Sequence, residues 1–256
     1  MPNRVIETEK IILYQAQLGD FANLNHLIVC KKTNKALIID PFYADYWLNF
    51  CSQSGWELTT VWLTHTHWDH SKAVPDLVDK EIWVHEDESL RGWDGPSNNH
   101  WSNPAWTVID LSFGELAFKG YSTPGHSPGH MAFSGEGIVV TGDCLFLGRC
   151  GRTDLFGSDR ESQRKSLLFM RKELELLPQD WLVFPGHLYE LSTGYSPSFI
   201  TVAQLLSQNE ALAAIDDDIS WESLDFLSFD DDLAKKAQLQ KSCLLYTSPS
   251  PRDQVV

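Results

Sequence analysis

Three histidines and an aspartate lie within seven residues in the segment THTHWDH, Thr64 to His70, although the chain of 256 residues holds only nine histidines. If this segment begins as a strand, side chains two positions apart share a face, so His65, His67 and, where the strand continues, Asp69 point the same way. A turn at Asp69–His70 would direct those two side chains toward a second centre, about 3.5–4 Å from the first in dinuclear hydrolases. The spacing therefore favours a metal site over scattered surface histidines.

Three further candidate ligands occupy distant segments: His126 in STPGHSPGH, Asp143 in VVTGDCLF and His187 in VFPGH. A glycine directly precedes each of them, and glycine allows a sharp backbone turn without a side chain that would crowd the metal. A lone histidine is more often a hydrogen-bonded core or surface residue, but four such motifs in one chain favour a metal centre. Nitrogen and oxygen ligands without cysteine suit Zn, Fe or Mn, and a carboxylate can bridge two ions.

The elements that position these residues follow from the hydrophobic pattern. Runs rich in β-branched and aromatic residues, such as TTVWLTH, GIVVTGD and WLVFPGH, indicate strands that end at candidate ligands. Residues 44–55 fit a helix that ends at Gly55, residues 158–177 fit a helix with Ser158 as its N-cap, and residues 198–215 fit one helix. We therefore expect an α/β protein in which helices cover sheets in layers.

The chain is expected to divide into a catalytic domain over residues 1–195, a helical C-terminal segment over 196–242, and a tail over 243–256. The tail contains CLLYTSPSPRD, Cys243 to Asp253, which looks like one reading frame of a sequencing-library adapter. We expect that the natural reading frame is interrupted near Ser242 and that a natural C-terminus is missing. A Pro/Ser-rich disordered tail is the alternative.

Charge and composition exclude several classes of partner. A formal net charge of −15 would repel the phosphates of nucleic acids and of anionic membranes. We find no apolar run of the roughly 18 residues that a membrane span needs and no apolar leader in MPNRVIETEK. The five cysteines form no CxxC pair, which fits reduced thiols, so we expect a cytoplasmic protein.

The motifs THTHWDH, TPGHSPGH, TGDCLF and FPGH, in this order, resemble those of the metallo-β-lactamase superfamily over about Gly19 to Tyr189. Within it, LFLGRCGRTDLFGSD resembles the branch of glyoxalase II (hydroxyacylglutathione hydrolase) and persulfide dioxygenase. The resemblance implies a four-layer αβ/βα sandwich with metals at one edge of the two sheets, here followed by a short helical C-terminal appendage.

The resemblance also implies two divalent metal ions, Zn in the first place and Fe or Mn as alternatives. One ion would be held by His65, His67 and His126, the other by Asp69, His70 and His187, with Asp143 as the shared ligand. His130 matches a position outside the ligand set, so we expect a structural hydrogen-bonding role for it. A hydroxide shared by the two ions would attack a carbonyl carbon. Asp143, which would hold both ions, and Asp69, which would hold one of them, are therefore the expected catalytic residues.

The expected substrate is a small-molecule thioester of the hydroxyacyl-glutathione kind, since a thiolate leaving group needs little acid assistance. Arg152 and Tyr189 match positions where glyoxalase II enzymes contact the thiol tripeptide, and an arginine could bind a carboxylate bidentately. The match is incomplete. Asp154 stands where those enzymes commonly have a second tyrosine, and their C-terminal basic residues have only Lys235 and Lys236 as candidate counterparts.

Two other functions stay open. A mononuclear Fe(II) persulfide dioxygenase would use a set of two histidines and one carboxylate, His65 or His67 with His126 and Asp143. In a non-catalytic metal-binding module, none of the seven ligands would take part in a reaction. Hydrolysis of β-lactams or nucleic acids fits the CGRTD segment and the acidic charge less well. The sequence does not indicate an oligomeric state.

Overall fold

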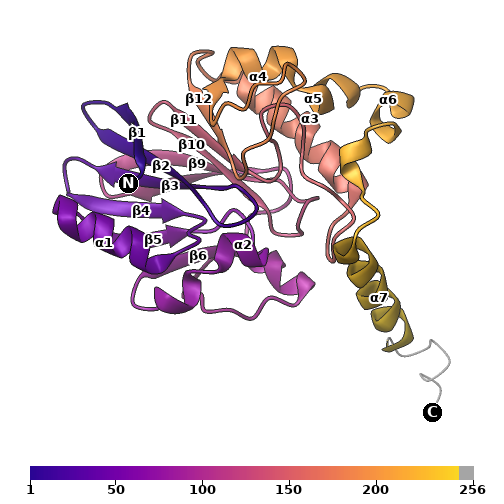
Figure 1. The fold of residues 1–256 in the computed structure, drawn as a ribbon, viewed down its shortest axis with the longest axis horizontal. Helices are drawn as coiled ribbons and strands as arrows, with labels where there is room; N and C mark the ends of the chain where they lie inside the picture. Colours follow the sequence, from indigo (N-terminus) through magenta and orange to yellow (C-terminus); the bar gives the residue numbers. More distant parts are fainter. Residues whose placement is uncertain (248–256) are drawn as a thin grey trace.

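The computed structural model describes the backbone of residues 1–247 and side chains up to Gln240. The adapter-like segment from Cys243 therefore lies outside the residues whose side chains are described. Two β-sheets form the centre of the molecule (Figure 1). The first sheet has the order β1-β2-β3-β4-β5-β6-β7, with β1 (Asn3–Glu7), β2 (Ile11–Leu18), β3 (Asn23–Cys30), β4 (Lys35–Ile39), β5 (Glu57–Trp62), β6 (Glu81–His85) and β7 (Asn99–Trp101).

The second sheet has the order β13-β12-β11-β10-β9-β8. Its strands are β8 (Val108–Phe113), β9 (Leu116–Ser122), β10 (Met131–Gly135), β11 (Ile138–Gly142), β12 (Leu182–Pro185) and β13 (Ile200–Thr201). Neighbouring strands are antiparallel in both sheets, except β4 to β7 in the first sheet and β11 with β12 in the second, which run parallel. Apolar side chains from both sheets pack together between them, among them Leu13, Trp62 and Phe133.

Helices cover the outer face of each sheet. Helix α1 (Ala44–Ser54) buries Trp47 and Cys51 against the first sheet and ends at Gly55, which has the left-handed conformation expected of a C-cap. Helix α3 (Arg160–Leu176) buries Leu167 and Met170 against the second sheet. The resulting order of helix, sheet, sheet and helix confirms the predicted αβ/βα sandwich (Figure 1).

Two helix ends differ from the prediction. The N-cap of α3 is Asp159 and not Ser158, because the Asp159 carboxylate accepts from the backbone N–H of Ser162, whereas the Ser158 hydroxyl donates to Leu155. Residues 198–215 do not form one helix. They form β13, α4 (Val202–Gln208) and α5 (Glu210–Ala214), with a break at Asn209, whose side chain caps α5 and donates to the carbonyl of Phe146. A long-range hydrogen bond thus overrides the local helical pattern.

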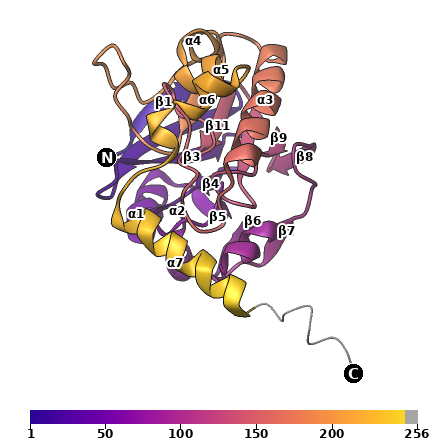
Figure 2. The ribbon, with the colours of Figure 1, turned by 90° about the vertical axis from the view of Figure 1, so that its right-hand side faces the viewer.

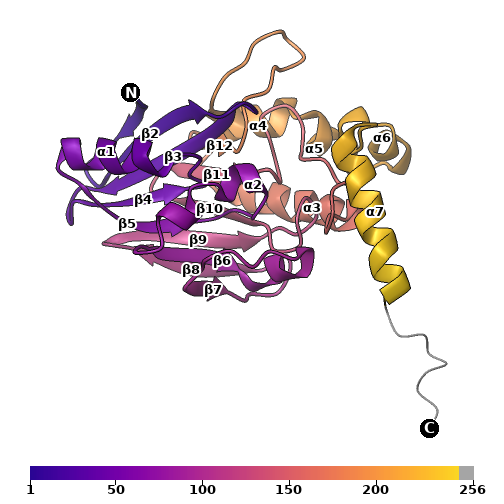
Figure 3. The ribbon, with the colours of Figure 1, turned by 60° about the horizontal axis from the view of Figure 1, so that its bottom comes forward.

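The remaining elements are short except for one helix. They are α2 (Trp68–Ser71), α6 (Asp218–Glu222), α7 (Asp232–Thr247) and the 3-10 turns η1 (Val74–Asp76), η2 (Glu86–Arg91) and η3 (Asp225–Leu227). The division at residue 195 stays a prediction. Strand β13, beyond this boundary, belongs to the second sheet, and α4 packs into the same core as α3. Figure 3 shows α7 beyond the ends of the strands of both sheets. Among the described residues, no helix is long and apolar enough to cross a bilayer.

Candidate metal centre

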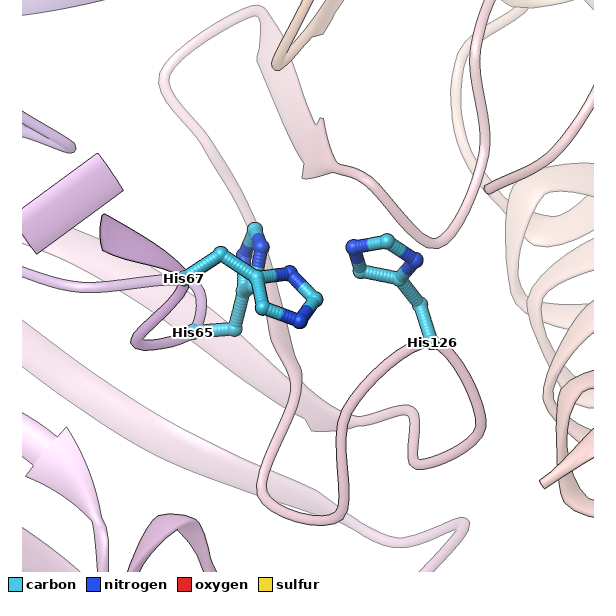
Figure 4. Close-up of side chains that lie close together, drawn as sticks. All are labelled: His65, His67 and His126. Atoms are coloured by element: carbon cyan, nitrogen blue, oxygen red, sulfur yellow. The ribbon is translucent and has the colours of Figure 1, made fainter. Parts of the chain in front are cut away.

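The first group of candidate ligands is His65, His67 and His126, whose ligand atoms all lie within 4.8 Å of one another. Figure 4 shows their rings facing a common space. Burial, together with the neighbouring histidines, lowers the pKa of His65 and His67, so the imidazoles are neutral as metal binding requires. The Nε2 atom of each ring is buried without a hydrogen-bond partner in the described part of the chain. Buried polar atoms normally have a partner, so three orphaned nitrogens around one space fit a metal ion.

The second group is Asp69, His70 and His187, whose ligand atoms also lie within 4.8 Å of one another. The Nε2 atoms of His70 and His187 are 3.0 Å apart, and His187 Nε2 is 3.4 Å from Asp69 Oδ2. Burial alone would lower the pKa of His70, but the carboxylates of Asp143 and Asp69 outweigh it and raise the pKa well above its ordinary value. A cation that binds here would displace the proton from His70, because metal binding to histidine releases protons, so this group can also bind a metal ion.

Asp143 lies between the two groups. Its Oδ2 is 3.5 Å from Nε2 of His126 in the first group and 3.2 Å from Nε2 of His187 in the second. Burial raises the pKa of Asp143, but His187 and His70 outweigh it and hold the pKa well below its ordinary value. The carboxylate is therefore ionised and placed where it can serve both groups.

One local expectation was wrong. The strand before the motif ends at Trp62, and His67 is the N-cap of α2. Asp69 lies in the first turn of this helix and groups with His70 and His187, so it does not share a face with His65. The predicted change of direction toward a second centre does occur, but the chain turns before Asp69 and not at it.

Hydrogen bonds to the far side of the rings fix their orientation. His126 Nδ1 is 2.8 Å from the carbonyl oxygen of Arg152, and His187 Nδ1 is 2.8 Å from that of Phe21. Both Nδ1 atoms must donate to these carbonyls, which leaves each Nε2 with a lone pair for a ligand. Such partners could not be identified from the sequence, because they are backbone atoms brought close by the fold.

Two polar residues that the sequence reasoning missed support the ligands in the same way. Asp40 accepts from the backbone N–H and hydroxyl of Thr64 and lies 3.0 Å from His70 Nδ1. It also falls within 4.8 Å of ligand atoms of His65 and His70, but its oxygens are occupied, so it orients the ligands. Asn23 donates to Asp69 Oδ2 at 2.9 Å. Asp40 follows the strand KALII directly, and this position was the only available signal.

Glu88 connects the two loops that carry the first group. Its side chain is fully buried. Oε2 accepts from the backbone N–H of Thr66 at 2.8 Å and from the Thr66 hydroxyl at 2.5 Å, and Oε1 accepts from the N–H of Gly129 at 2.8 Å. Thr66 lies between His65 and His67, and Gly129 follows three residues after His126. One carboxylate thus sets the distance between the loops.

Two of the glycines before the candidate ligands lie where a side chain would not fit. Gly125 has a φ of 147°, and a Cβ there would lie 2.3 Å from the backbone of Gln163. At Gly186 a Cβ would lie 2.2 Å from Oδ1 of Asp143. A side chain at either position would displace the backbone or a candidate ligand.

The other histidines and the cysteine beside Asp143 are structural. His130 Nε2 accepts from the backbone N–H groups of Asp143 and Cys144, both at 3.1 Å, which confirms the expected hydrogen-bonding role. Cys144 is fully buried, and burial raises the pKa of its thiol to about 12, so it is a packed thiol. His26 and His85 are buried and bonded to backbone carbonyls.

Both groups open into a cavity of about 800 Å³. Tyr189 and Phe146 line the wall beside His187, and Trp68 and Phe21, whose rings contact each other edge to face, also line the cavity. The first half of α7 also contributes, and Figure 2, which faces this end of the molecule, shows α7 crossing its lower part. The cavity can hold a small molecule next to the candidate ligands.

Arg152 and Tyr189, predicted to contact the substrate, both line this cavity. The guanidinium of Arg152 is bound on two sides by carboxylates, with distances of 2.6 and 2.9 Å to Asp154 and of 2.7 and 3.0 Å to Asp231. Its proposed role toward a substrate carboxylate therefore competes with two internal partners.

Comparison with known proteins agrees with this geometry. The family model of the metallo-beta-lactamase superfamily matches residues 19–187. A hydroxyacylglutathione hydrolase from Photorhabdus laumondii subsp. laumondii is 30% identical over 171 residues, which cover 64% of this chain and 62% of that relative, so the match spans less than two thirds of its length. The crystal structure of ETHE1 from Myxococcus xanthus superposes with a TM-score of 0.68 at 24% identity, covering 91% of this chain and 99% of that one, and shows the fold. The crystal structure of TTHA1623 in a di-iron-bound form gives a TM-score of 0.58 at 27% identity, covering 76% and 98% of the two chains. The chain belongs to the metallo-β-lactamase superfamily.

Proposed function

We propose that this chain is a dinuclear metal hydrolase that cleaves a thioester of the hydroxyacyl-glutathione type. One observation carries the proposal: two complete groups of ligand atoms share one ionised carboxylate, that of Asp143, at the floor of a cavity. The similarity to a hydroxyacylglutathione hydrolase supports the thioester class. The similarity to a protein crystallised in a di-iron-bound form supports two ions, and the nitrogen and oxygen ligand set suits Zn, Fe or Mn.

The seven side chains have distinct roles in this proposal. His65, His67 and His126 would hold one ion, Asp69, His70 and His187 the other, and Asp143 both. When bound, two such ions lower the pKa of a water molecule toward about 7 and polarise a carbonyl group.

The other side chains around the centre position the attacking water and the substrate. Asn23 holds the Asp69 carboxylate at the cavity wall, where it can orient the attacking water. The aromatic wall of Phe146 and Tyr189 excludes water from one side of the substrate. Because a thiolate is a stable leaving group, no separate acid is required, and the described residues need supply only position and charge.

A mononuclear persulfide dioxygenase is the second candidate. It is favoured by the distance of 3.5 Å between His126 Nε2 and Asp143 Oδ2, since this places a carboxylate beside the first group and completes a set of two histidines and one carboxylate without the second group.

Metal analysis and two assays separate these candidates. The purified chain is analysed for Zn, Fe and Mn, and assayed for hydrolysis of S-lactoylglutathione and for sulfite formation from glutathione persulfide. Two metal ions per chain with thioester cleavage is the expected result. One iron per chain with oxygen consumption would establish the second candidate in its place.

A further inference from the structure

Arg149, three residues before Arg152, is a cation on the cavity wall that the family resemblance does not assign. Its guanidinium carbon lies 3.7 Å from the centre of the Tyr189 ring. Its Nε is buried and has no hydrogen-bond partner in the described part of the chain. Among residues 1–240, no ion pair involves Arg149. A buried N–H of a charged group normally has an acceptor, so we expect a bound ligand to supply an acceptor for this N–H.

Arg152 differs from Arg149 in the net charge of its surroundings. Its guanidinium is neutralised by Asp154 and Asp231, and the three groups together carry one net negative charge. A carboxylate approaching Arg152 would meet two others and would have to displace one of them. An anionic group of a substrate is therefore disfavoured at Arg152 and favoured at Arg149.

The guanidinium of Arg149 lies over the ring of Tyr189, and Tyr189 also accepts a side-chain hydrogen bond from it, so the donors left for a substrate are the N–H groups that face neither contact. A guanidinium that lies over an aromatic ring uses its face for the ring, and its N–H groups point outward in its own plane. Those in-plane donors match the two oxygens of a carboxylate. The aromatic ring also fixes the side chain in advance, so less conformational entropy is lost on binding.

The position of Arg149 relates this site to the candidate metal centre. The ring of Tyr189 lies 5.9 Å from that of His187, a ligand of the second group. A molecule with its reactive carbonyl at the centre would therefore reach Arg149 with a group a few bonds away.

Two further cations line the wall besides Arg152. Arg91 donates to the carbonyl and hydroxyl oxygens of Thr66. The side chain of Lys236 on α7 is exposed, so water and salt weaken its attraction.

We propose that Arg149, stacked on Tyr189, is the specificity-determining residue that binds a carboxylate of the substrate, in the place where the family resemblance had suggested Arg152. This inference rests on the proposed function, because it assumes a thioester whose thiol part carries a carboxylate.

Binding of a non-hydrolysable probe tests the assignment without turnover. Calorimetry on the metal-loaded full chain compares S-methylglutathione with its diester, in which both carboxylates are blocked. The wild type should bind the acid about 10- to 100-fold more tightly, as expected for charge-assisted hydrogen bonds. Arg149→Met should abolish this preference and leave the affinity for the diester within about twofold, while Arg149→Lys should restore part of it, since lysine keeps the charge but not the fork.

Lys236→Met is the matched control, because it removes the same charge from the same cavity. It should change the preference for the acid by no more than about threefold. Absence of a preference in the wild type, its persistence in Arg149→Met, or an equal loss in Lys236→Met would each overturn the assignment.

Hydrolysis of S-lactoylglutathione by the same variants separates this inference from the proposed function. With Arg149→Met, KM should rise about 10- to 100-fold with little change in kcat, because the carboxylate lies away from the reacting carbonyl. If the wild type prefers the acid to the diester but does not hydrolyse the thioester, the proposed function is refuted and the role of Arg149 in carboxylate binding stands. If Arg149→Met hydrolyses the thioester with unchanged KM and kcat, the role of Arg149 in carboxylate binding is refuted and the proposed function stands.

Discussion

Replacing Glu88 by glutamine tests whether a residue outside the ligand set holds the metal centre together. The substitution keeps the size of the side chain but exchanges one carboxylate oxygen for an NH₂ group. In the wild type, three donors face the two oxygens: the N–H and hydroxyl of Thr66 and the N–H of Gly129. Glutamine can accept at only one end, so its NH₂ group must face one of the two backbone N–H groups.

The expected loss follows from this count. A buried N–H left without an acceptor costs about 1–3 kcal/mol, and the hydrogen bonds that remain lose the assistance of the charge. We therefore expect Glu88→Gln to lower the free energy of unfolding by about 2–4 kcal/mol. For a chain of this size, that corresponds to a fall in Tm of roughly 5–15 °C. Because the loops of His65, His67 and His126 are no longer held at one distance, affinity for the metal should fall about 10- to 100-fold, in the range measured for residues that orient metal ligands.

Two measurements check the expectation. Differential scanning calorimetry of the metal-free protein gives the loss of stability, and competition with a chromophoric chelator gives zinc affinity. Glu86→Gln is the matched control, because Glu86 lies in the same turn η2 but is exposed, and it should change Tm by less than about 2 °C. Wild-type zinc affinity in Glu88→Gln would refute the reasoning, whatever the change in Tm.

The remaining predictions concern the centre and helix α7. Asp143→Ala should lose bound metal and activity together, as measured by metal analysis after dialysis, and full metal content would show that the bridging role is misassigned. Gly186→Ala should reduce metal content as well, since its Cβ would lie 2.2 Å from Asp143 Oδ1; an unchanged content would mean that the loop adapts. Removing metal with a chelator should lower Tm by roughly 8–16 °C if metal is normally present at 1,000 times its Kd, and an equal Tm with and without metal would contradict binding in the folded state. Arg152 lowers the pKa of Asp231 to about 2, so the ion pair stabilises the fold above the ordinary aspartate pKa of about 4 and is lost as pH falls toward 2. Asp231→Asn should therefore flatten the profile of Tm against pH in this range, while Asp230→Asn should not.

The layers of the fold could be predicted from apolar patterns in short segments, and the two ligand groups from the resemblance to the metallo-β-lactamase superfamily. Apolar runs rich in β-branched and aromatic residues indicate strands, and candidate ligands lie after the ends of such strands, Asp143 directly after β11 and His187 two residues after β12. Helix details were less reliable. The N-cap of α3 moved from Ser158 to Asp159, since both residues can cap and only the geometry chooses between them. The break at Asn209 depends on the carbonyl of Phe146, 63 residues away in the chain.

The sequence by itself determined which residue types could bind a metal and in what order they occur, because spacing along one segment fixes which side chains can face a common point. Only the tertiary structure decided how distant groups are paired. It joined Glu88 to both ligand loops, placed Asp143 between two groups, and bound Arg152 to Asp154 and Asp231, while among the described residues it gave Arg149 no carboxylate partner. The physical reason is that the charge a side chain presents to a ligand depends on the partners that folding brings to it, and those partners lie far away in the sequence.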